Sequence, residues 1–372
     1  MTDNKTNILI ECYEHVPTYD MTLRDFKRYT SLLPINVRGK LTKDIIPEDV
    51  SWCDVLIDVR GCNPLSAHLV HEVKKLGRKT VLMLDDDMME IYNQDISYDS
   101  TVFAKSLRQV LTDVDCLLTS SKYLGEKYKQ CYGIEYALVN TTVEDSQFVH
   151  ADKERELHDI RLLYAANPRQ RSAFEEFIVP ILGQLYQQYG DKVSLTIIGP
   201  NINIEGVGLR VQKYPAMPFD TYRAFMDSHS FDIGLAPLVD SESSRSKYFN
   251  KYLEYSTNGV CGIYSNVLPF TLVVRDSING FLVDNNPDSW YETLCAAIDN
   301  PELCQACVNS AHEQILQEHS LKAVATKLFT DMHSILSFKA EQSSKKVARF
   351  MYIKYLYFAL SRRLISFFKR SN

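Results

Sequence analysis

Apolar segments rich in β-branched residues alternate with segments of helical periodicity along most of the chain. In the run 65–76, for example, Leu69, Val70, Val73 and Leu76 fall at the spacing of one helix face. Continuous apolar strands that alternate with helices are typical of parallel sheets covered by helices. The pattern therefore predicts an α/β protein. The strands of its first half are expected at 7–12, 54–59, 80–84, 116–119 and 136–139.

A polar, acidic stretch at 142–157 interrupts the alternation, and we interpret it as a linker between domains. The alternation then resumes, which predicts two Rossmann-like domains with a central cleft. We place the first domain at 1–150, the second at 151–338 and a tail at 339–372. In the second domain, strands are expected at 160–165, 193–198, 209–211, 233–238 and 262–265. Helices are expected there at 172–189, 219–228, 248–257, 287–299, 301–317 and 321–336.

The composition of the chain indicates which compartment and which class of partner to expect. The net charge of −6 gives no reason to expect nucleic acid. The start of the chain lacks the basic residues and long apolar core of a signal peptide, and no run reaches the roughly eighteen apolar residues of a membrane span. The nine cysteines are scattered, as expected of free thiols in a reducing cytoplasm, and the lone CxxC of Cys304 and Cys307 suggests packing inside a helix rather than zinc. We therefore expect a cytoplasmic protein.

The segment FDIGLAPLVDSESSRSKYFNKYLEYSTNGVCGIYSNV contains a buried strand, a polar loop and an expected helix that begins near Lys247. Lys247, Lys251 and Glu254 are spaced by four and then three residues, so a helix would present them on one face. Free N–H groups and basic side chains at a helix start suit a diphosphate, and a carboxylate further along can accept hydrogen bonds from a ribose diol. A solvated Lys/Glu helix face would explain the same spacing.

Two arginines, Arg169 and Arg171, lie in the loop AANPRQRSAFEEF, just before an expected helix. Because an arginine can bind phosphate oxygens through two parallel hydrogen bonds, we assign both to the diphosphate of a ligand. A solvated loop charge is the alternative for each residue.

In the first domain, Asp85, Asp86 and Asp87 directly follow a buried strand and so lie at the carboxyl edge of its sheet. Clustered carboxylates raise one another's pKa and need partners. A divalent metal site, a site for acceptor or sugar hydroxyls, and a helix cap are the competing interpretations. We favour hydroxyl contact, with one of the three aspartates as a helix N-cap. His15, in the loop ECYEHVPTYDMTLR, is a further candidate on this side.

The segment 231–283 as a whole resembles the donor-binding half of glycosyltransferase family 4, in which a D-I-G-L-A-P-L strand precedes K-x3-K-x-L-E-Y. In that family the second glutamate of an E-x7-E motif binds the nucleotide ribose, and Glu254 occupies its position. Ser246 stands where the first glutamate would be, so the chain departs from the family where the donor sugar is held. An Asp-rich run like that at 85–87 is familiar in a subgroup of these enzymes that acts in surface polysaccharide synthesis.

The resemblance implies a GT-B fold and a metal-independent, hexosyltransferase-like enzyme that retains the anomeric configuration. It would move a sugar from a nucleotide-diphosphate donor to a hydroxyl of a glycan or lipid-linked acceptor, in capsule, O-antigen or other surface polysaccharide synthesis. The catalytic candidates are then Lys247, Arg169 and Asp86. Donor contacts would come from Arg169, Arg171, Ser246, Lys247, Lys251 and Glu254, and acceptor contacts from His15, Asp85, Asp86 and Asp87, with no metal and no cofactor besides the donor.

The stretch 342–372 holds eight Lys or Arg, seven aromatic residues and no acid. A basic aromatic helix of this kind can lie in an anionic membrane surface. A helix that packs back on the first domain is the alternative. Because Phe367 and Phe368 beside Lys369 and Arg370 suit burial in protein poorly, we favour peripheral association with the inner face of the plasma membrane.

Two other classes of protein fit the same pattern. A sugar-nucleotide epimerase has a similar architecture, although it needs acid and base groups in the cleft and has no use for a membrane-seeking tail. A degenerate, non-catalytic transferase-like binding protein would be consistent with the serine at position 246.

Overall fold

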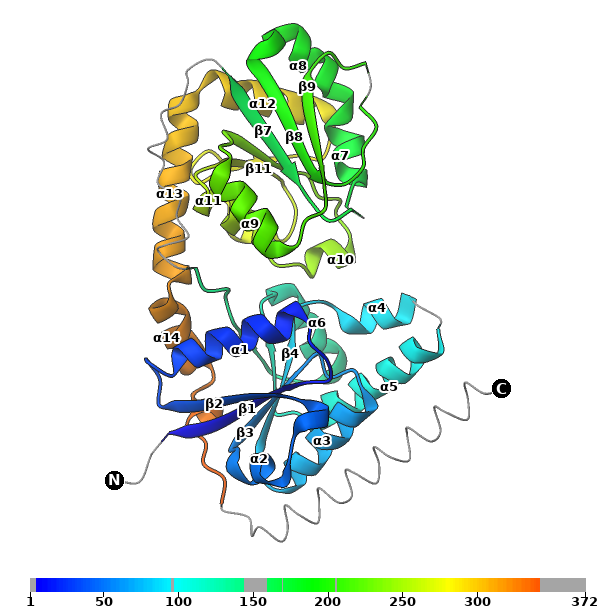
Figure 1. Cartoon of the computed structure of the whole chain (residues 1–372), viewed down its shortest axis with the longest axis vertical. Helices are drawn as coiled ribbons and strands as arrows, with labels where there is room; N and C mark the ends of the chain where they lie inside the picture. Colours follow the sequence, from blue (N-terminus) through cyan, green and yellow to red (C-terminus); the bar gives the residue numbers. More distant parts are fainter. Residues whose placement is uncertain (1–4, 95–96, 144–158, 169, 205, 342–372) are drawn as a thin grey trace. The chain divides into compact units, whose positions relative to one another are not determined.

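The computed structural model describes residues 5–94, 97–143, 159–168, 170–204 and 206–341. The chain divides into two compact units, unit 1 (Met1–Thr142 with Leu321–Asn372) and unit 2 (Val143–Ser320). Each unit contains a six-stranded sheet in which all paired strands run parallel (Figure 1). The predicted α/β class, with two Rossmann-like domains, is therefore confirmed.

The sheet of unit 1 has the strand order β2-β1-β3-β4-β5-β6 and is buried on both faces. In β1, Ile8 and Ile10 join one apolar cluster and Leu9 joins the other. Two-sided burial explains why this strand is a continuous apolar run. The strands are β1 (Thr6–Cys12), β2 (Ile35–Leu41), β3 (Val55–Val59), β4 (Lys79–Leu84), β5 (Cys116–Thr119) and β6 (Tyr136–Leu138). The helices between them are α1 (Pro17–Tyr29), α2 (Pro47–Trp52), α3 (Pro64–Lys75), α4 (Met88–Gln94), α5 (Tyr98–Asp113) and α6 (Lys122–Tyr132).

The last two described helices, α14 (Leu321–Asp331) and α15 (His333–Leu336), belong to unit 1. We predicted them to close the second domain, and that placement is wrong. Their apolar side chains lie at helical spacing and join the buried cluster of β1 and α1, so the sheet of unit 1 is the surface that they cover. These side chains are Val324, Ala325, Leu328, Met332, Ile335 and Leu336.

The chain continues in contact with unit 1 after α15. The Thr6 hydroxyl donates to the Phe338 carbonyl at 3.2 Å. Asp54 binds both the Lys339 ammonium at 3.3 Å and the Ala340 N–H at 3.0 Å. The predicted tail, 339–372, is described only as far as Glu341; its remaining residues lie outside the described part of the chain. Among the helices that the structure describes, none is long and apolar enough to cross a membrane.

The sheet of unit 2 has the order β12-β11-β10-β7-β8-β9. Its strands are β7 (Ile160–Ala165), β8 (Val193–Gly199), β9 (Arg210–Pro215), β10 (Ile233–Ala236), β11 (Cys261–Ser265) and β12 (Phe281–Val283). Its helices are α7 (Ser172–Phe177), α8 (Leu182–Tyr189), α9 (Phe219–Ser228), α10 (Glu242–Arg245), α11 (Asn250–Thr257), α12 (Pro287–Asp299) and α13 (Pro301–His319).

Two local predictions need correction. The expected helix 172–189 is two helices, because Pro180 has no N–H to donate and lies in the 3-10 turn Val179–Ile181 between them. The edge strand β2 was not predicted, since its sequence INVRGKL contains an arginine and a glycine and only its first residue is buried.

Candidate active site

The donor-side candidates follow the carboxyl end of β10 in unit 2. The short helix α10 comes first, capped by the Ser241 hydroxyl, which accepts from the Ser244 N–H at 3.1 Å. The longer helix α11 begins only at Asn250. Lys247 therefore lies in the connection between the two helices, and the prediction that the helix begins near Lys247 is wrong.

Ser246, at the position of the family's first glutamate, ends α10. Its side chain is buried, and its hydroxyl donates to the Glu242 carbonyl at 3.0 Å. A serine that bonds the carbonyl four residues earlier closes the last turn of its own helix. In this structure the Ser246 hydroxyl is thus engaged with backbone.

The connection that carries Lys247 leads directly into the start of α11. The Lys247 N–H donates to the Ser244 carbonyl at 3.1 Å, which fixes the backbone of this turn. The N-cap of α11 is Phe249, which makes no side-chain capping bond. The first turn of α11 therefore presents N–H groups and a partial positive charge beside a lysine, a combination that suits phosphate oxygens.

Glu254 lies in the second turn of α11 at the centre of a small polar cluster. The Lys251 ammonium lies 2.7 Å from its Oε1 atom and 2.8 Å from its Oε2 atom. The hydroxyl of Tyr222, on α9, donates to Oε1. We call these three residues the Glu254 cluster. The predicted neighbourhood of Lys251 and Glu254 is present, but the lysine is directed at the carboxylate.

The two arginines near α7 are described unequally. Arg171 is the N-cap residue of α7, and its Nε atom lies 3.7 Å from Glu175 Oε2. Both side chains are largely exposed, so this ion pair contributes less than about 1 kcal/mol and leaves Arg171 able to rearrange toward a ligand. Arg169 lies outside the described residues, and its assignment stays a prediction.

In unit 1, Asp85 follows β4 at the carboxyl edge of the sheet. The guanidinium of Arg60 binds it with two hydrogen bonds, Nε to Oδ1 at 3.1 Å and Nη2 to Oδ2 at 3.0 Å. The Thr18 hydroxyl donates to Oδ2 at 2.5 Å. Paired, bidentate geometry of this kind fixes the orientation of the Asp85 carboxylate.

The three consecutive aspartates have different surroundings. Asp86 is 49% exposed, and its Oδ2 atom lies 3.7 Å from Arg60 Nη2. Asp87 is 5% exposed, pairs with the Lys127 ammonium at 2.6 Å, and accepts from the Glu90 N–H in the first turn of α4 and from the Tyr128 hydroxyl. The prediction that one of the three caps a helix is confirmed for Asp87.

Arg60 was missed in the sequence, although a weak signal was present. It follows the buried strand β3 directly and has φ of 69°, a conformation that is uncommon outside glycine. A basic residue at the end of a buried strand lies at the same sheet edge as the aspartates after β4. Tyr222 had no such signal, because it reaches Glu254 from a separate helix 32 residues earlier.

Beneath this edge, Glu11 on β1 and Asp58 on β3 are directly paired neighbours, and both are 0% exposed. The Thr42 hydroxyl donates to Glu11 Oε2 at 2.5 Å, and the Gly61 N–H donates to Asp58 Oδ1 at 3.2 Å. Burial raises the pKa of Glu11 to about 7, and burial together with the charge of Glu11 raises the pKa of Asp58. Two buried carboxylates on paired neighbouring residues repel each other when both are ionised, so the pair holds at least one proton near neutral pH.

This pair predicts a pH dependence of stability. The folded protein keeps the Glu11 proton up to about pH 7, whereas the unfolded chain releases it near pH 4.5. The stabilisation from the protonated Glu11 is therefore fully present below the pKa of the unfolded chain, and it is lost as pH rises through the pKa of the folded protein. We expect Glu11 to contribute a fall in the free energy of unfolding on the order of 2–3 kcal/mol across this window, and Glu11→Gln to remove that contribution while the contribution of Asp58 remains. Urea denaturation between about pH 5 and about pH 8 measures the free energy of unfolding of the wild type and of Glu11→Gln. Glu48→Gln, at an exposed position, is the control. If this free energy depended on pH equally in Glu11→Gln and the wild type, the raised pKa of Glu11 would be contradicted.

His15 is 69% exposed, and its Nδ1 atom lies 3.3 Å from Asp20 Oδ1. Its ring meets Tyr19 edge-on, with centroids 5.8 Å apart. The structure thus places His15 in the loop between β1 and α1, where its described contacts are local. Its acceptor role stays a prediction.

The CxxC pair is buried in the core of unit 2. Cys304 and Cys307 lie on α13 and face Cys261 at the start of β11, whose thiol lowers the pKa of Cys307 to about 7. In the part of the chain that the structure describes, no group of three or more His, Cys, Asp or Glu side chains could hold a metal ion. Packing is the role that the structure shows for these thiols.

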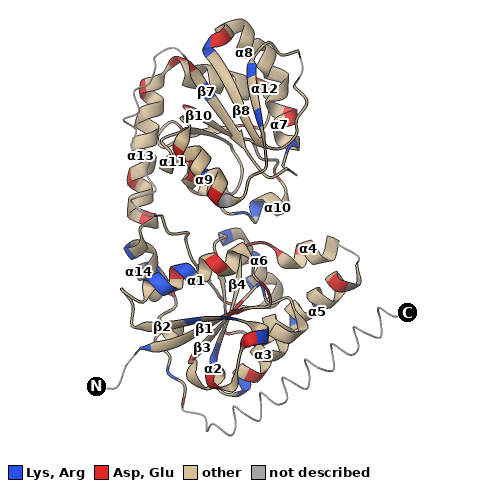
Figure 2. Ribbon diagram, in the orientation of Figure 1, with Lys and Arg blue, Asp and Glu red and all other residues tan. Residues whose placement is uncertain are grey.

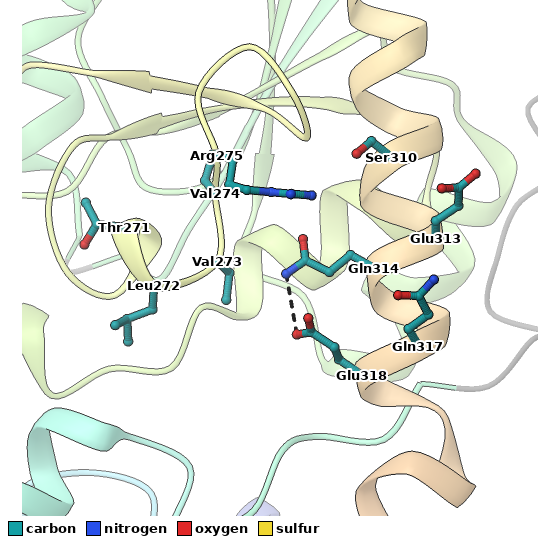
Figure 3. A pocket seen from close by; sticks show the side chains of 10 residues that line it. All are labelled: Thr271, Leu272, Val273, Val274, Arg275, Ser310, Glu313, Gln314, Gln317 and Glu318. Atoms are coloured by element: carbon teal, nitrogen blue, oxygen red, sulfur yellow. Dashed lines mark hydrogen bonds between the residues drawn. The ribbon is translucent and has the colours of Figure 1, made fainter.

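A cavity of about 430 Å³ lies between the β11–β12 connection and α13 (Figure 3). Arg275 extends across it toward α13, and Gln314 points into it and accepts from the Tyr252 hydroxyl at 2.9 Å. Acidic residues recur along α13, and the cavity includes Glu313 and Glu318 (Figure 2). Of the predicted donor residues that the structure describes, none lines this cavity.

Comparison of sequences gives no relative: no family model and no curated protein matches the chain. Comparison with solved structures, in contrast, finds similar proteins. The neighbours are glycosyltransferases of the GT-B fold, and two Rossmann-like units with parallel six-stranded sheets define that fold class. The predicted GT-B fold is therefore confirmed.

Three of these neighbours illustrate the likeness. A glycosyltransferase from Rickettsia africae has a TM-score of 0.64 at 13% identity, over 90% of this chain and 99% of its own. Anabaena HepE, solved with UDP and glucose, has a TM-score of 0.62 at 11% identity, over 88% of this chain and 100% of its own. WaaG, a glycosyltransferase involved in lipopolysaccharide biosynthesis, has a TM-score of 0.57 at 13% identity, over 87% of this chain and 99% of its own. At identities this low, the structural similarity establishes the fold alone.

Proposed function

We propose that the protein is a glycosyltransferase that moves a sugar from a nucleotide-diphosphate donor to a hydroxyl of a glycan or lipid-linked acceptor. The observation that carries the proposal is the Glu254 cluster, a fixed carboxylate on the helix that follows the Lys247 connection in a GT-B fold. Structures of Anabaena HepE contain UDP and UDP-glucose, which supports a nucleotide sugar as the donor class. Retention of the anomeric configuration and a role in surface polysaccharide synthesis are further parts of the proposal, taken from the resemblance to family 4.

In the proposed reaction, the bond between the anomeric carbon and the diphosphate oxygen breaks, and its electron pair stays on that oxygen. The acceptor hydroxyl oxygen forms the new bond to the anomeric carbon and passes its proton to the departing diphosphate oxygen. Negative charge grows on the leaving diphosphate, so fixed positive groups stabilise the transition state more than the ground state. We assign this task to Lys247, the start of α11, Arg171 and Arg169. Lys251, which is paired with Glu254, is assigned to ribose binding instead. The proposed reaction needs no metal ion.

On the side of unit 1, we propose that Asp86 binds a hydroxyl of the acceptor. Its carboxylate is half exposed at the carboxyl edge of the sheet, where ligands of parallel α/β domains bind. Asp85 is held by Arg60 and Thr18, which gives Asp86 a rigid neighbour. Asp87 has its partners inside the protein, and we now assign it to the fold rather than to the acceptor.

Release of nucleoside diphosphate, measured with a panel of nucleotide sugars and hydroxyl acceptors, tests the proposed function. We expect release that depends on both one donor and one acceptor. Interconversion of free donor sugars without release would indicate an epimerase. Binding of donor without release in any combination would indicate a non-catalytic binding protein.

We also propose that the basic tail associates with an anionic membrane surface. A chain truncated after Glu341 keeps the contacts of Phe338, Lys339 and Ala340 with unit 1 and removes only the tail. We expect it to lose most of its binding to vesicles that contain anionic lipid, because each basic residue near such a surface contributes about 1 kcal/mol. Cosedimentation with anionic and neutral vesicles measures this, and unchanged binding to the anionic vesicles would overturn the membrane assignment.

A further inference from the structure

The Glu254 cluster contains a residue that the motif does not assign. Tyr222 comes from α9, a helix separate from the Lys247 connection and α11. Its hydroxyl donates to Glu254 Oε1, and its ring lies beside the Lys251 ammonium, which is 5.5 Å from the ring centroid. The ring of Tyr255 lies 5.7 Å from the same ammonium. Two aromatic rings and a carboxylate therefore hold the lysine in place.

These contacts fix the direction of the Glu254 carboxylate. The hydrogen bonds of the described residues place two donors on Oε1, the Tyr222 hydroxyl and the Lys251 ammonium, and one on Oε2. Burial and the negative charge of Glu254 raise the pKa of Tyr222, so the phenol keeps its proton and remains a donor. A carboxylate has about four lone-pair sites, so acceptor capacity remains mainly on Oε2.

We propose that Tyr222 is a positioning residue of the donor site and sets its preference for ribose over deoxyribose. By engaging Oε1, it directs the remaining acceptor capacity of Glu254 toward the ribose hydroxyls of the nucleotide. This inference rests on the proposed function, in which Glu254 binds ribose. A site built to hydrogen-bond a hydroxyl discriminates against the analogue that lacks it, because that analogue cannot form the bond.

The Tyr222→Phe variant separates positioning from packing. It removes one oxygen atom and keeps the aromatic ring beside Lys251, so the packing of α9 is preserved. A purely structural role would weaken the binding of ribonucleotides and deoxyribonucleotides by the same factor. Loss of positioning would weaken only the ligand whose hydroxyl Glu254 recognises.

The experiment is calorimetric titration of the full-length chain with UDP, GDP and their 2′-deoxy counterparts. For the ribonucleotide that binds, we expect wild type to prefer it over the deoxy form by about tenfold or more, the effect of one lost hydrogen bond. Tyr222→Phe should reduce this preference to about twofold, through weaker binding of the ribonucleotide. In the Glu254→Gln background, the additional Tyr222→Phe change should leave the ratio unaltered.

Tyr214→Phe is the matched control, since Tyr214 packs against the same helix through Phe225. It should keep the wild-type preference. A Tyr222→Phe variant with the wild-type ratio, or with both ligands weakened equally, would overturn the positioning role. Equal binding of ribo and deoxy forms by wild type would also overturn it while leaving the glycosyltransferase proposal standing. Failure of wild type to bind either nucleotide would overturn the proposed function itself.

Discussion

Lys247→Ala is expected to lower kcat for sugar transfer by about 100-fold, the loss seen when one fixed donor to a developing negative charge is removed. The reason is its position in the connection between α10 and α11, beside the N–H groups of the first turn of α11. KM for the donor should change less, because the charge on the diphosphate grows as the glycosidic bond breaks. Release of nucleoside diphosphate under saturating donor measures the effect.

The control for this variant is Lys192→Ala. Lys192 is exposed and precedes β8, so it lies at the amino edge of the same sheet, opposite the ligand-binding edge. It should keep the wild-type kcat. If Lys247→Ala turns over as fast as Lys192→Ala, the assignment of Lys247 to the leaving diphosphate is wrong.

Asp87→Ala should destabilise unit 1 by about 3 kcal/mol, the cost of breaking a buried ion pair. The variant loses the first-turn cap of α4, which contributes about 1 kcal/mol by itself. It also leaves the Lys127 ammonium and the buried Tyr128 hydroxyl without this carboxylate. Urea denaturation followed by circular dichroism measures the change.

The neighbouring Asp86→Ala is the matched control, because it removes the same group one residue earlier. Asp86 is half exposed and 3.7 Å from Arg60, so its loss should cost less than about 1 kcal/mol. Its effect should appear in turnover instead. Equal destabilisation by the two variants would contradict the division of roles between a structural Asp87 and a ligand-binding Asp86.

Much of the fold was predictable because its central strands are buried on both faces. The runs that became β1, β3 and β4 are almost continuously apolar, and helical spacing marked α3 between them. Edge strands such as β2 gave a weaker pattern, because solvent on one side admits polar residues. Nothing local indicated that α14 crosses back to unit 1, since an amphipathic helix does not specify which sheet it covers.

The candidate site was predictable only where it is local in sequence. Lys251 and Glu254 are three residues apart on one helix, and their proximity followed from spacing. The partners of Glu254 and Asp85 were not predictable in this way. Tyr222 is 32 residues from Glu254, and Arg60 is 25 residues from Asp85, so the fold alone brings them together.

We propose that unit 2 binds a nucleoside diphosphate at the start of α11. A crystal structure of the full chain soaked with UDP or GDP tests it most directly. We predict the ribose hydroxyls within hydrogen-bonding distance of Glu254 and the diphosphate beside Lys247 and the first N–H groups of α11. A nucleotide bound elsewhere on the chain, with Glu254 and Lys247 unchanged in their contacts, would contradict the account.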